Sequence, residues 1–187
     1  MKRNLQIFLL FATLMSPVLL PAQRLFTRNA KVYFDATSKN SPEKVDASNK
    51  SGTLVVDVAT GRVEAAVLMS NFLFEKALMQ EHFNENYMES AKYPKATFKG
   101  KIEDQAKVNF AQDGTYNAVL TGDLTVHGVT KPVKLPVTFQ VKAGKITANA
   151  SFNIALADYG IDIPSVVRDK LGREAKISIN SDLEPMK

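Results

Sequence analysis

The chain has 187 residues and a formal net charge of +5, with 45% hydrophobic and 23% charged residues. This is ordinary for a soluble globular protein, and the length allows one domain with a substantial core. The basic residues are scattered, which argues against nucleic acid as a partner, and the absence of cysteine excludes disulfides, thiol nucleophiles and thiolate metal sites.

Residues 1–22 have the pattern of a Sec-type signal peptide. Lys2 and Arg3 form a positive start, a long apolar stretch follows, and Ala22 provides a small residue for cleavage. The apolar stretch is shorter than the ~20 residues that a spanning helix needs. We therefore expect a mature domain of residues 23–187 that is periplasmic or secreted and has no stable membrane span. Without a cysteine there is also no lipobox.

The first half of the chain predicts strands interrupted by one helix. From Phe74 to about Tyr87 the sequence is rich in helix formers, with aromatic and aliphatic side chains at i,i+4 spacing. We expect two to three helical turns against a sheet, ending before Pro94. The expected strands are 24–38, 53–59 and 62–70, with a polar loop at 41–52 and a turn at Thr60-Gly61.

The second half is dominated by a long β-hairpin. Apolar residues at period two run from Tyr116 to Val126 and again from Val129, interrupted only by Lys131, on both sides of a reversal at His127-Gly128. This spacing puts one face of each strand on a core and the other on water. Further strands are expected at 95–103, 106–111, 145–157 and 173–183, with an irregular segment at 158–171 that includes a short helix.

About eight antiparallel strands with one helical insertion predict an all-β barrel or sandwich. Several strands exceed ten residues and have one continuous apolar face, which favours the barrel. A barrel of about eight strands is either filled by its own side chains or holds one small ligand. The aromatic and methionine residues at 72–93 fit two interpretations equally well, a helix packed on a sheet or an apolar lid over the barrel mouth.

Residues suited to catalysis are sparse. No serine lies in a Gly-x-Ser-x-Gly setting, and there is no glycine-rich phosphate loop. A metal-dependent hydrolase would need His82, on the expected helix, and His127, at the hairpin turn, in one site with carboxylates. We expect no catalytic residue, no metal, and a structural hydrogen bond at His127.

Two segments resemble the signature of the YceI-like family, also called the polyisoprenoid-binding family. They are Gly122-Asp-Leu-Thr-Val-His-Gly-Val-Thr-Lys-Pro-Val133 and His82-Phe-Asn-Glu-Asn-Tyr-Met-Glu-Ser-Ala-Lys-Tyr-Pro-Lys-Ala-Thr-Phe98. The resemblance covers residues 25 to 185. Met79-Gln80 stands where members commonly have Arg-Asp, so the chain resembles a divergent branch.

The resemblance implies a lipocalin-like, extended antiparallel β-barrel in the periplasm. It also implies that a long isoprenoid lipid, a quinone or a similar amphiphile is bound inside without catalysis, and that there is no other cofactor. The residues alone leave open an exported structural or interaction barrel with a self-filled core and no ligand, and they leave open a homodimer. By analogy and strand parity the ligand contacts are Phe74, Leu78, Phe83, Phe98, Leu124, Phe152 and Ile154, with His82, Asn84 and Tyr159 as polar groups near the mouth.

Overall fold

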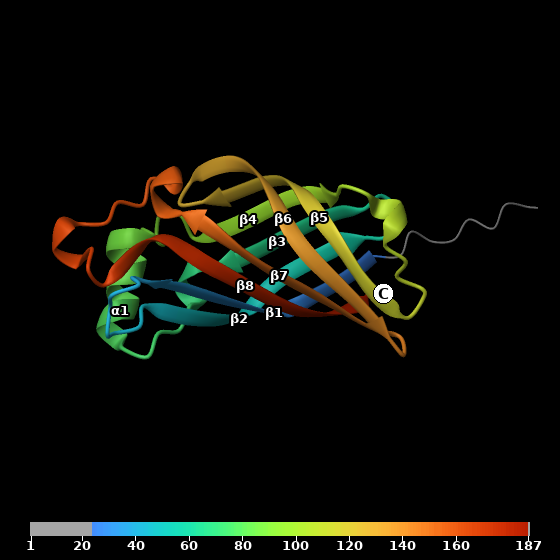
Figure 1. Cartoon of the computed structure of the whole chain (residues 1–187), viewed down its shortest axis with the longest axis horizontal. Coiled ribbons are helices and arrows are strands. Elements are labelled where there is room, and N and C mark those ends of the chain that lie inside the picture. Colours follow the sequence, from blue (N-terminus) through green and yellow to red (C-terminus); the bar gives the residue numbers. More distant parts are fainter. Residues whose placement is uncertain (1–23, 187) are drawn as a thin grey trace, which may run out of the picture.

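The computed structural model describes residues 24–186, and the expected signal peptide lies outside this range. Eight antiparallel strands form one closed barrel in chain order, because the last strand also pairs with the first (Figure 1). The expected all-β barrel with a short helical insertion is therefore confirmed. The strands are β1 Arg24–Thr37, β2 Asp46–Asp57, β3 Arg62–Leu68, β4 Lys95–Ile102, β5 Gly114–Val126, β6 Val129–Lys142, β7 Lys145–Ala155 and β8 Leu171–Pro185.

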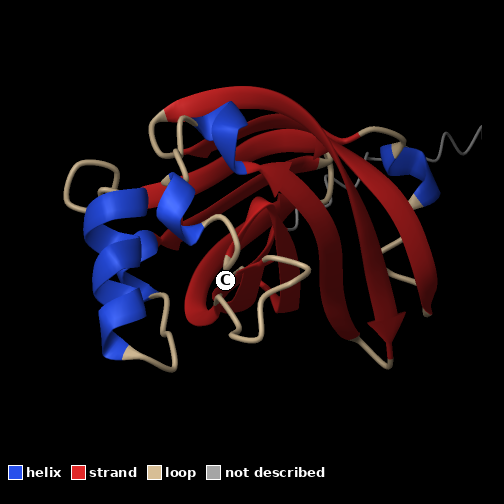
Figure 2. Cartoon of the chain, turned by 60° about the vertical axis from the view of Figure 1, so that its left-hand side comes forward, coloured by secondary structure: helices blue, strands red, loops and turns tan. Residues whose placement is uncertain are grey.

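The helical insertion between β3 and β4 lies at one end of the barrel (Figures 1 and 2). It begins with the 3-10 turn η1 (Met69–Asn71), and α1 (Ala77–His82) then runs directly into a π-helical turn, η2 (Phe83–Tyr87). The helix begins later than Phe74, where it was expected. Leu73 instead exchanges backbone hydrogen bonds with Ser48 of β2, which holds this part of the chain extended.

Two other local expectations were wrong. Residues 106–111, expected as a strand, contain the end of a 3-10 turn, η3 (Gln105–Lys107), and are irregular after it. Phe110 still packs inward, with its ring centroid 5.2 Å from that of Phe139. Residues 46–52, expected as loop, belong to β2, because pairing with β1 outweighs the weak strand propensity of this polar stretch.

The irregular segment between β7 and β8 contains two short turns. They are η4 (Leu156–Tyr159) and η5 (Ser165–Val167). The backbone after η4 is left-handed at Gly160, with φ 67°, which ends the turn and returns the chain toward the barrel. The short helix expected at 163–172 is thus the single 3-10 turn η5.

The two segments that carry the family resemblance meet in space. His127 and Gly128 form the two-residue turn between β5 and β6, with φ 49° and 74°. The His127 ring lies edge-on to Tyr93, with centroids 4.7 Å apart. Its Nδ1 is 3.1 Å from the Tyr159 carbonyl oxygen, and its Nε2 is 2.9 Å from Glu89 Oε2. The structural hydrogen bond expected at His127 is confirmed.

Gly122 allows β4 and β5 to approach closely. It pairs with Gly100, and a Cβ atom on Gly122 would lie 2.3 Å from the Lys99 carbonyl oxygen. A Cβ on Gly100 would lie 2.6 Å from Cζ of Phe98, so the space left by the glycines is used by that ring. The glycine of the hairpin motif therefore serves packing inside the barrel.

Candidate functional site

The barrel is solid in one half and hollow in the other. One end holds both termini of the described chain and the β6–β7 turn (Figure 1), and buried side chains fill the barrel there. Leu25, Val56 and Phe139 are each at most 1% exposed there. Toward the end that carries α1, the barrel encloses a cavity of about 570 Å³. The two possibilities for an eight-stranded barrel, a filled core and a ligand cavity, thus occur in different halves of the same molecule.

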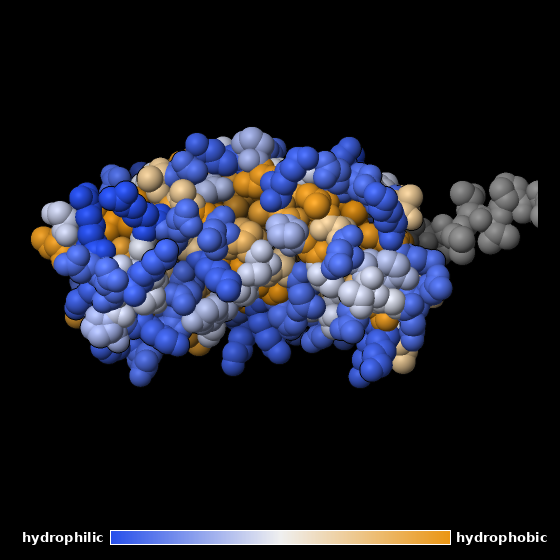
Figure 3. Space-filling view, viewed as in Figure 1, coloured by the Kyte–Doolittle hydropathy of each residue, from blue (hydrophilic) through white to orange (hydrophobic). Residues whose placement is uncertain are grey.

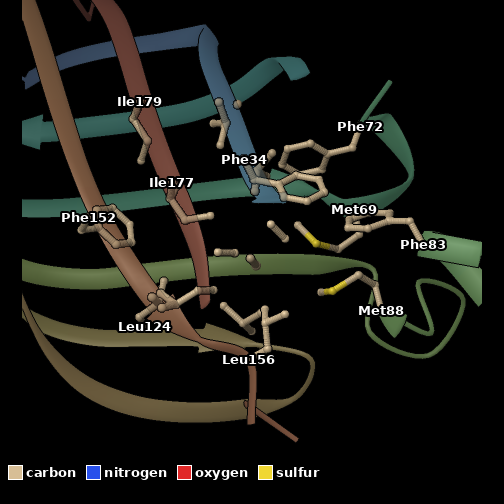
Figure 4. Close-up of a pocket in the computed structure, with 18 of the residues that line it drawn as sticks. Phe34, Met69, Phe72, Phe83, Met88, Leu124, Phe152, Leu156, Ile177 and Ile179 are labelled. Atoms are coloured by element: carbon tan, nitrogen blue, oxygen red, sulfur yellow. The ribbon is translucent and has the colours of Figure 1, made fainter. Parts of the chain in front are cut away.

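The wall of the cavity is mainly apolar. Figure 4 shows Met69, Phe83 and Met88 near the helical insertion, and Phe152 and Ile177 on the strands opposite. Pockets of this kind bind ligands through apolar contact and a few polar groups that orient them. We call the end that carries α1 the covered end. Within residues 24–186, the charged side chains and histidine in the lining all come from segments at this end: Glu43, Lys76, His82 and Lys170.

Four phenylalanine rings pack together where the cavity reaches the covered end, and we call them the aromatic plug. Phe34 of β1 lies 5.5 Å from Phe72 and 5.3 Å from Phe83, measured between ring centroids. Phe74 lies 5.1 Å from Phe83. Such pairs contribute roughly 0.5–1.5 kcal/mol each beyond the burial of their area. The plug therefore gives the barrel a firm end cap on this side.

Glu43 connects three segments at the same end. It lies in the β1–β2 loop, and its carboxylate accepts hydrogen bonds from Lys76, which precedes α1, and from Lys170, which precedes β8. The second of these bonds has a length of 3.3 Å. The two ammonium groups, that of Lys76 foremost, hold the pKa of the Glu43 carboxyl below its ordinary value.

We expect Glu43→Gln to loosen the covered end without unfolding the barrel. Because the folded-state pKa is lowered, the carboxylate contributes stability above its ordinary pKa, and that contribution is lost as the pH falls through the folded value. Amide hydrogen exchange at residues 72–84 should be faster in the variant than in the wild type at neutral pH, and the difference should vanish well below pH 4.5. Identical exchange at neutral pH would show that the ion pairs do not hold this end.

Eight of the ten residues proposed for ligand contact or for the mouth lie in the cavity wall. Phe98 and Leu124 are buried there, at 6% and 8% exposed, whereas Leu78 is 61% exposed at the rim. Direct contact with a ligand remains a prediction for all of them. The other wall residues of this set are Phe74, Phe83, Phe152, Ile154 and His82.

Tyr159 is one of two proposed residues outside the wall, and its contact with a ligand stays a prediction. The η4 turn directs Leu156 into the wall, as Figure 4 shows, and Ile161 follows it there. Tyr159 itself is 3% exposed, outside the lining, and its carbonyl faces His127. Burial, aided by Asp158, raises the pKa of its phenol.

Asn84 lies outside the lining too. Its Nδ2 donates to the Gln80 carbonyl at 2.9 Å. His82 Nδ1 lies 3.0 Å from Nδ2 of Asn86, so the two histidines have different partners. Among residues 24–186, no group of three His, Cys, Asp or Glu side chains is placed to hold a metal ion.

Sequence reasoning missed part of the wall. Ile177 and Ile179 of β8 face the cavity, and their period-two spacing was a usable signal. Met69 and Met88 flank the helical insertion, and both are buried against the cavity. Their positions depend on how the insertion folds back over the barrel end, for which no local pattern exists.

Comparison with known proteins identifies related sequences. The family model for the YceI-like domain matches residues 24–183. A UPF0312 protein of Pseudomonas savastanoi pv. phaseolicola is 29% identical over 123 residues, which are 60% of this chain and 60% of that protein. One from Pseudomonas putida (strain GB-1) is 31% identical over 98 residues, 49% of this chain and 47% of its own length. The chain thus spans about 60% or less of the length of these relatives.

Solved structures share the fold at low identity. A polyisoprenoid-binding domain from Saccharophagus degradans, implicated in plant cell wall breakdown, aligns with a TM-score of 0.74 and 14% identity over 88% of this chain and 99% of that one. Burkholderia cenocepacia BcnA aligns with a TM-score of 0.64 and 19% identity, over 83% and 96% of the two chains. The likeness extends over the whole barrel.

Proposed function

The chain belongs to the YceI-like domain family, and we propose that it is a carrier that holds the chain of an isoprenoid or another long amphiphile in its barrel, without catalysis. The observation that carries this proposal is the apolar cavity of about 570 Å³ beside a fully packed half-barrel. Its size is within the ~300–1,000 Å³ typical of ligand pockets. A barrel that served only as a scaffold could be filled throughout, as its other half is.

The composition of the wall supports a chain-like ligand. Each buried CH₂ group contributes roughly 0.8 kcal/mol, and apolar contact has no preferred direction, so chains of related shape would bind similarly. Polar groups at the covered end, such as Lys76 and His82, lie where a head group could be oriented. Isoprenoid lipids and quinones combine such a chain with a small polar head. The binding ascribed to the Saccharophagus degradans domain agrees with this class.

The proposed place of action is the periplasm, or the medium if the protein is secreted. This part of the proposal rests on the signal-peptide pattern of residues 1–22. Across residues 24–186, none of the helices has the length and apolar character needed to cross a bilayer. An exported carrier would shield an apolar chain from water between two membranes. One copy of the chain suffices for this role, and light scattering would measure whether a homodimer forms.

The alternative is an exported interaction barrel with a self-filled core and no ligand. The packed half of the barrel agrees with it, and the cavity in the other half argues against it. A metal-dependent hydrolase would bring both histidines into one site, whereas His127 contacts Glu89 and Tyr159, and His82 contacts Asn86.

Native mass spectrometry of the full-length gene product, purified after export by its own host, tests the proposal. We expect the protein to carry a lipid adduct that denaturation releases, and the stripped protein to rebind an isoprenoid quinone. Protein that is consistently free of ligand and also rejects isoprenoid quinones would contradict the proposed function. Recovery of the same lipid from a variant with a filled cavity would indicate adsorption to the surface instead.

A further inference from the structure

Strands β6 and β7 separate halfway along the barrel. Their pairing begins beside the β6–β7 turn, where Lys142 pairs with Lys145. It ends where Val137 pairs with Ala150. Residues 129–136 of β6 remain paired to β5, and residues 151–155 of β7 remain paired to β8. The facing edges of these two segments are therefore unpaired within the part of the chain that the structure describes. We call the opening between them the side slot.

Apolar residues of the inner wall are less buried beside the side slot than where β6 and β7 pair. Inward residues of β7 are buried where it pairs with β6, at 8% exposed for Ile146 and 4% for Ala148. Beyond the last pair they become half-exposed. Figure 3 shows apolar surface in the middle of the face on which β6 and β7 diverge in Figure 1. The half-exposed inward residues of β7 and β8, which also line the cavity, are Ala150, Phe152, Ile154, Ile177 and Ile179.

The edge of β6 that faces the slot is built against pairing. Thr138, Gln140 and Lys142 bond to β7, because the two-residue turn at 143–144 makes Lys142 and Lys145 a hydrogen-bonded pair. Residues of the same parity nearer the start of β6 therefore direct their backbone groups toward the slot. Two of these are Pro132 and Pro136, which have no N–H to donate. Prolines at such positions are typical of edges that stay open.

The covered end of the barrel, in contrast, is obstructed by packed side chains. The aromatic plug narrows it, and Glu43 connects the surrounding segments to Lys76 and Lys170. Between residues 129–136 and 151–155, the described side chains form no hydrogen bond or ion pair with one another. A ligand that passed the plug would have to separate packed rings, whereas at the slot it meets an open apolar margin.

We propose that the apolar chain of the ligand enters and leaves the cavity sideways, through the side slot. This inference rests on the proposed function and adds to it the route and the shape of the ligand. Five unpaired residues of β7 at ~3.3 Å each give an opening about 17 Å long. An opening of that length matches a linear, flexible chain that lies along it. The chain would be transferred one segment at a time, with no need to open the plug.

Single cysteines that are blocked after folding test the route. The described chain has no cysteine, so each variant carries one reactive thiol. Ser151→Cys places it on the outer rim of the slot, Glu81→Cys on the exposed side of α1 at the covered end, and Lys99→Cys on the outer face of β4 as a matched control. Each protein is modified with a bulky thiol reagent through a reducible disulfide. The association rate of a dansyl-labelled farnesyl probe is then measured by stopped-flow fluorescence.

Blocking position 151 should slow association about tenfold or more while the other two modified proteins keep the unmodified rate. Reduction of the disulfide should restore the rate, which separates steric blocking from damage to the fold. A rate that falls for position 81 and not for 151 would overturn the side route. Failure of the unmodified proteins to bind the probe would refute the proposed function, and the route with it. If the probe binds but the protein blocked at position 151 keeps the unmodified rate, only the route is refuted.

Discussion

Ile177→Trp is expected to abolish ligand binding while leaving the barrel folded. The Ile177 side chain points into the hollow half, as Figure 4 shows, and it is only half-buried because empty space lies before it. A tryptophan there would extend into the cavity and occupy the volume that the ligand needs. We expect affinity to fall about a hundredfold, equivalent to roughly 2.7 kcal/mol, with thermal stability unchanged or higher because more apolar area is buried.

The chain offers a clean control for this experiment. Lys176→Trp introduces the same residue one position earlier, on the outer face of β8, and should leave affinity unchanged. The protein has no other tryptophan, so the fluorescence of each variant reports its own site. A blue-shifted emission from position 177 and a water-like one from 176 would verify the placement. Normal affinity in a folded Ile177→Trp protein would contradict a ligand in the cavity.

Truncation of Phe139 is expected to be far more damaging than the same truncation at Phe152. Phe139 is 1% exposed in the solid half and packs against Phe110. Phe139→Ala should lower the free energy of unfolding by about 3–5 kcal/mol, because it leaves a hole among packed groups. Phe152 faces the cavity and is half-exposed, so Phe152→Ala should cost less than about 2 kcal/mol.

Urea unfolding followed by circular dichroism measures both variants under the same conditions. The Phe152→Ala protein should also bind ligand less tightly, whereas any effect of Phe139→Ala on binding should follow its loss of stability. Equal destabilisation by the two substitutions would mean that the hollow half is collapsed and packed in solution. That result would weigh against a ligand-holding barrel as well.

Most of the barrel could be predicted from local patterns. Period-two spacing predicted the β5–β6 hairpin, and a histidine followed by glycine at positions 127 and 128 predicted its turn. The errors arose where another part of the chain decides. Residues 46–52 have weak strand propensity and become strand through β1, and Leu73 is held extended by Ser48. The π-helical turn after α1 likewise has no pattern in its sequence.

The candidate site was predictable to the extent that it follows strand parity. Phe98, Leu124 and Phe152 are inward-facing by alternation, and they lie in the wall. Tyr159 follows no such rule, because a turn sets its direction, and the structure places it beside His127 instead. The two segments of the family resemblance meet at the β5–β6 turn, where His127 contacts Tyr93 and Glu89. These contacts hold the turn in place and do not line the cavity.

The sequence by itself determined the alternation of most strands, an all-β architecture for which a barrel was favoured over a sandwich, and the place of its helical insertion. Only the tertiary structure decided which half is hollow and where the wall opens. Phe139 and Phe152 have the same inward parity, yet one packs against Phe110 and the other meets empty space. Alternation specifies the side of a strand on which a residue lies. What faces it across the barrel depends on strand register, on the separation of β6 from β7, and on loops distant in sequence.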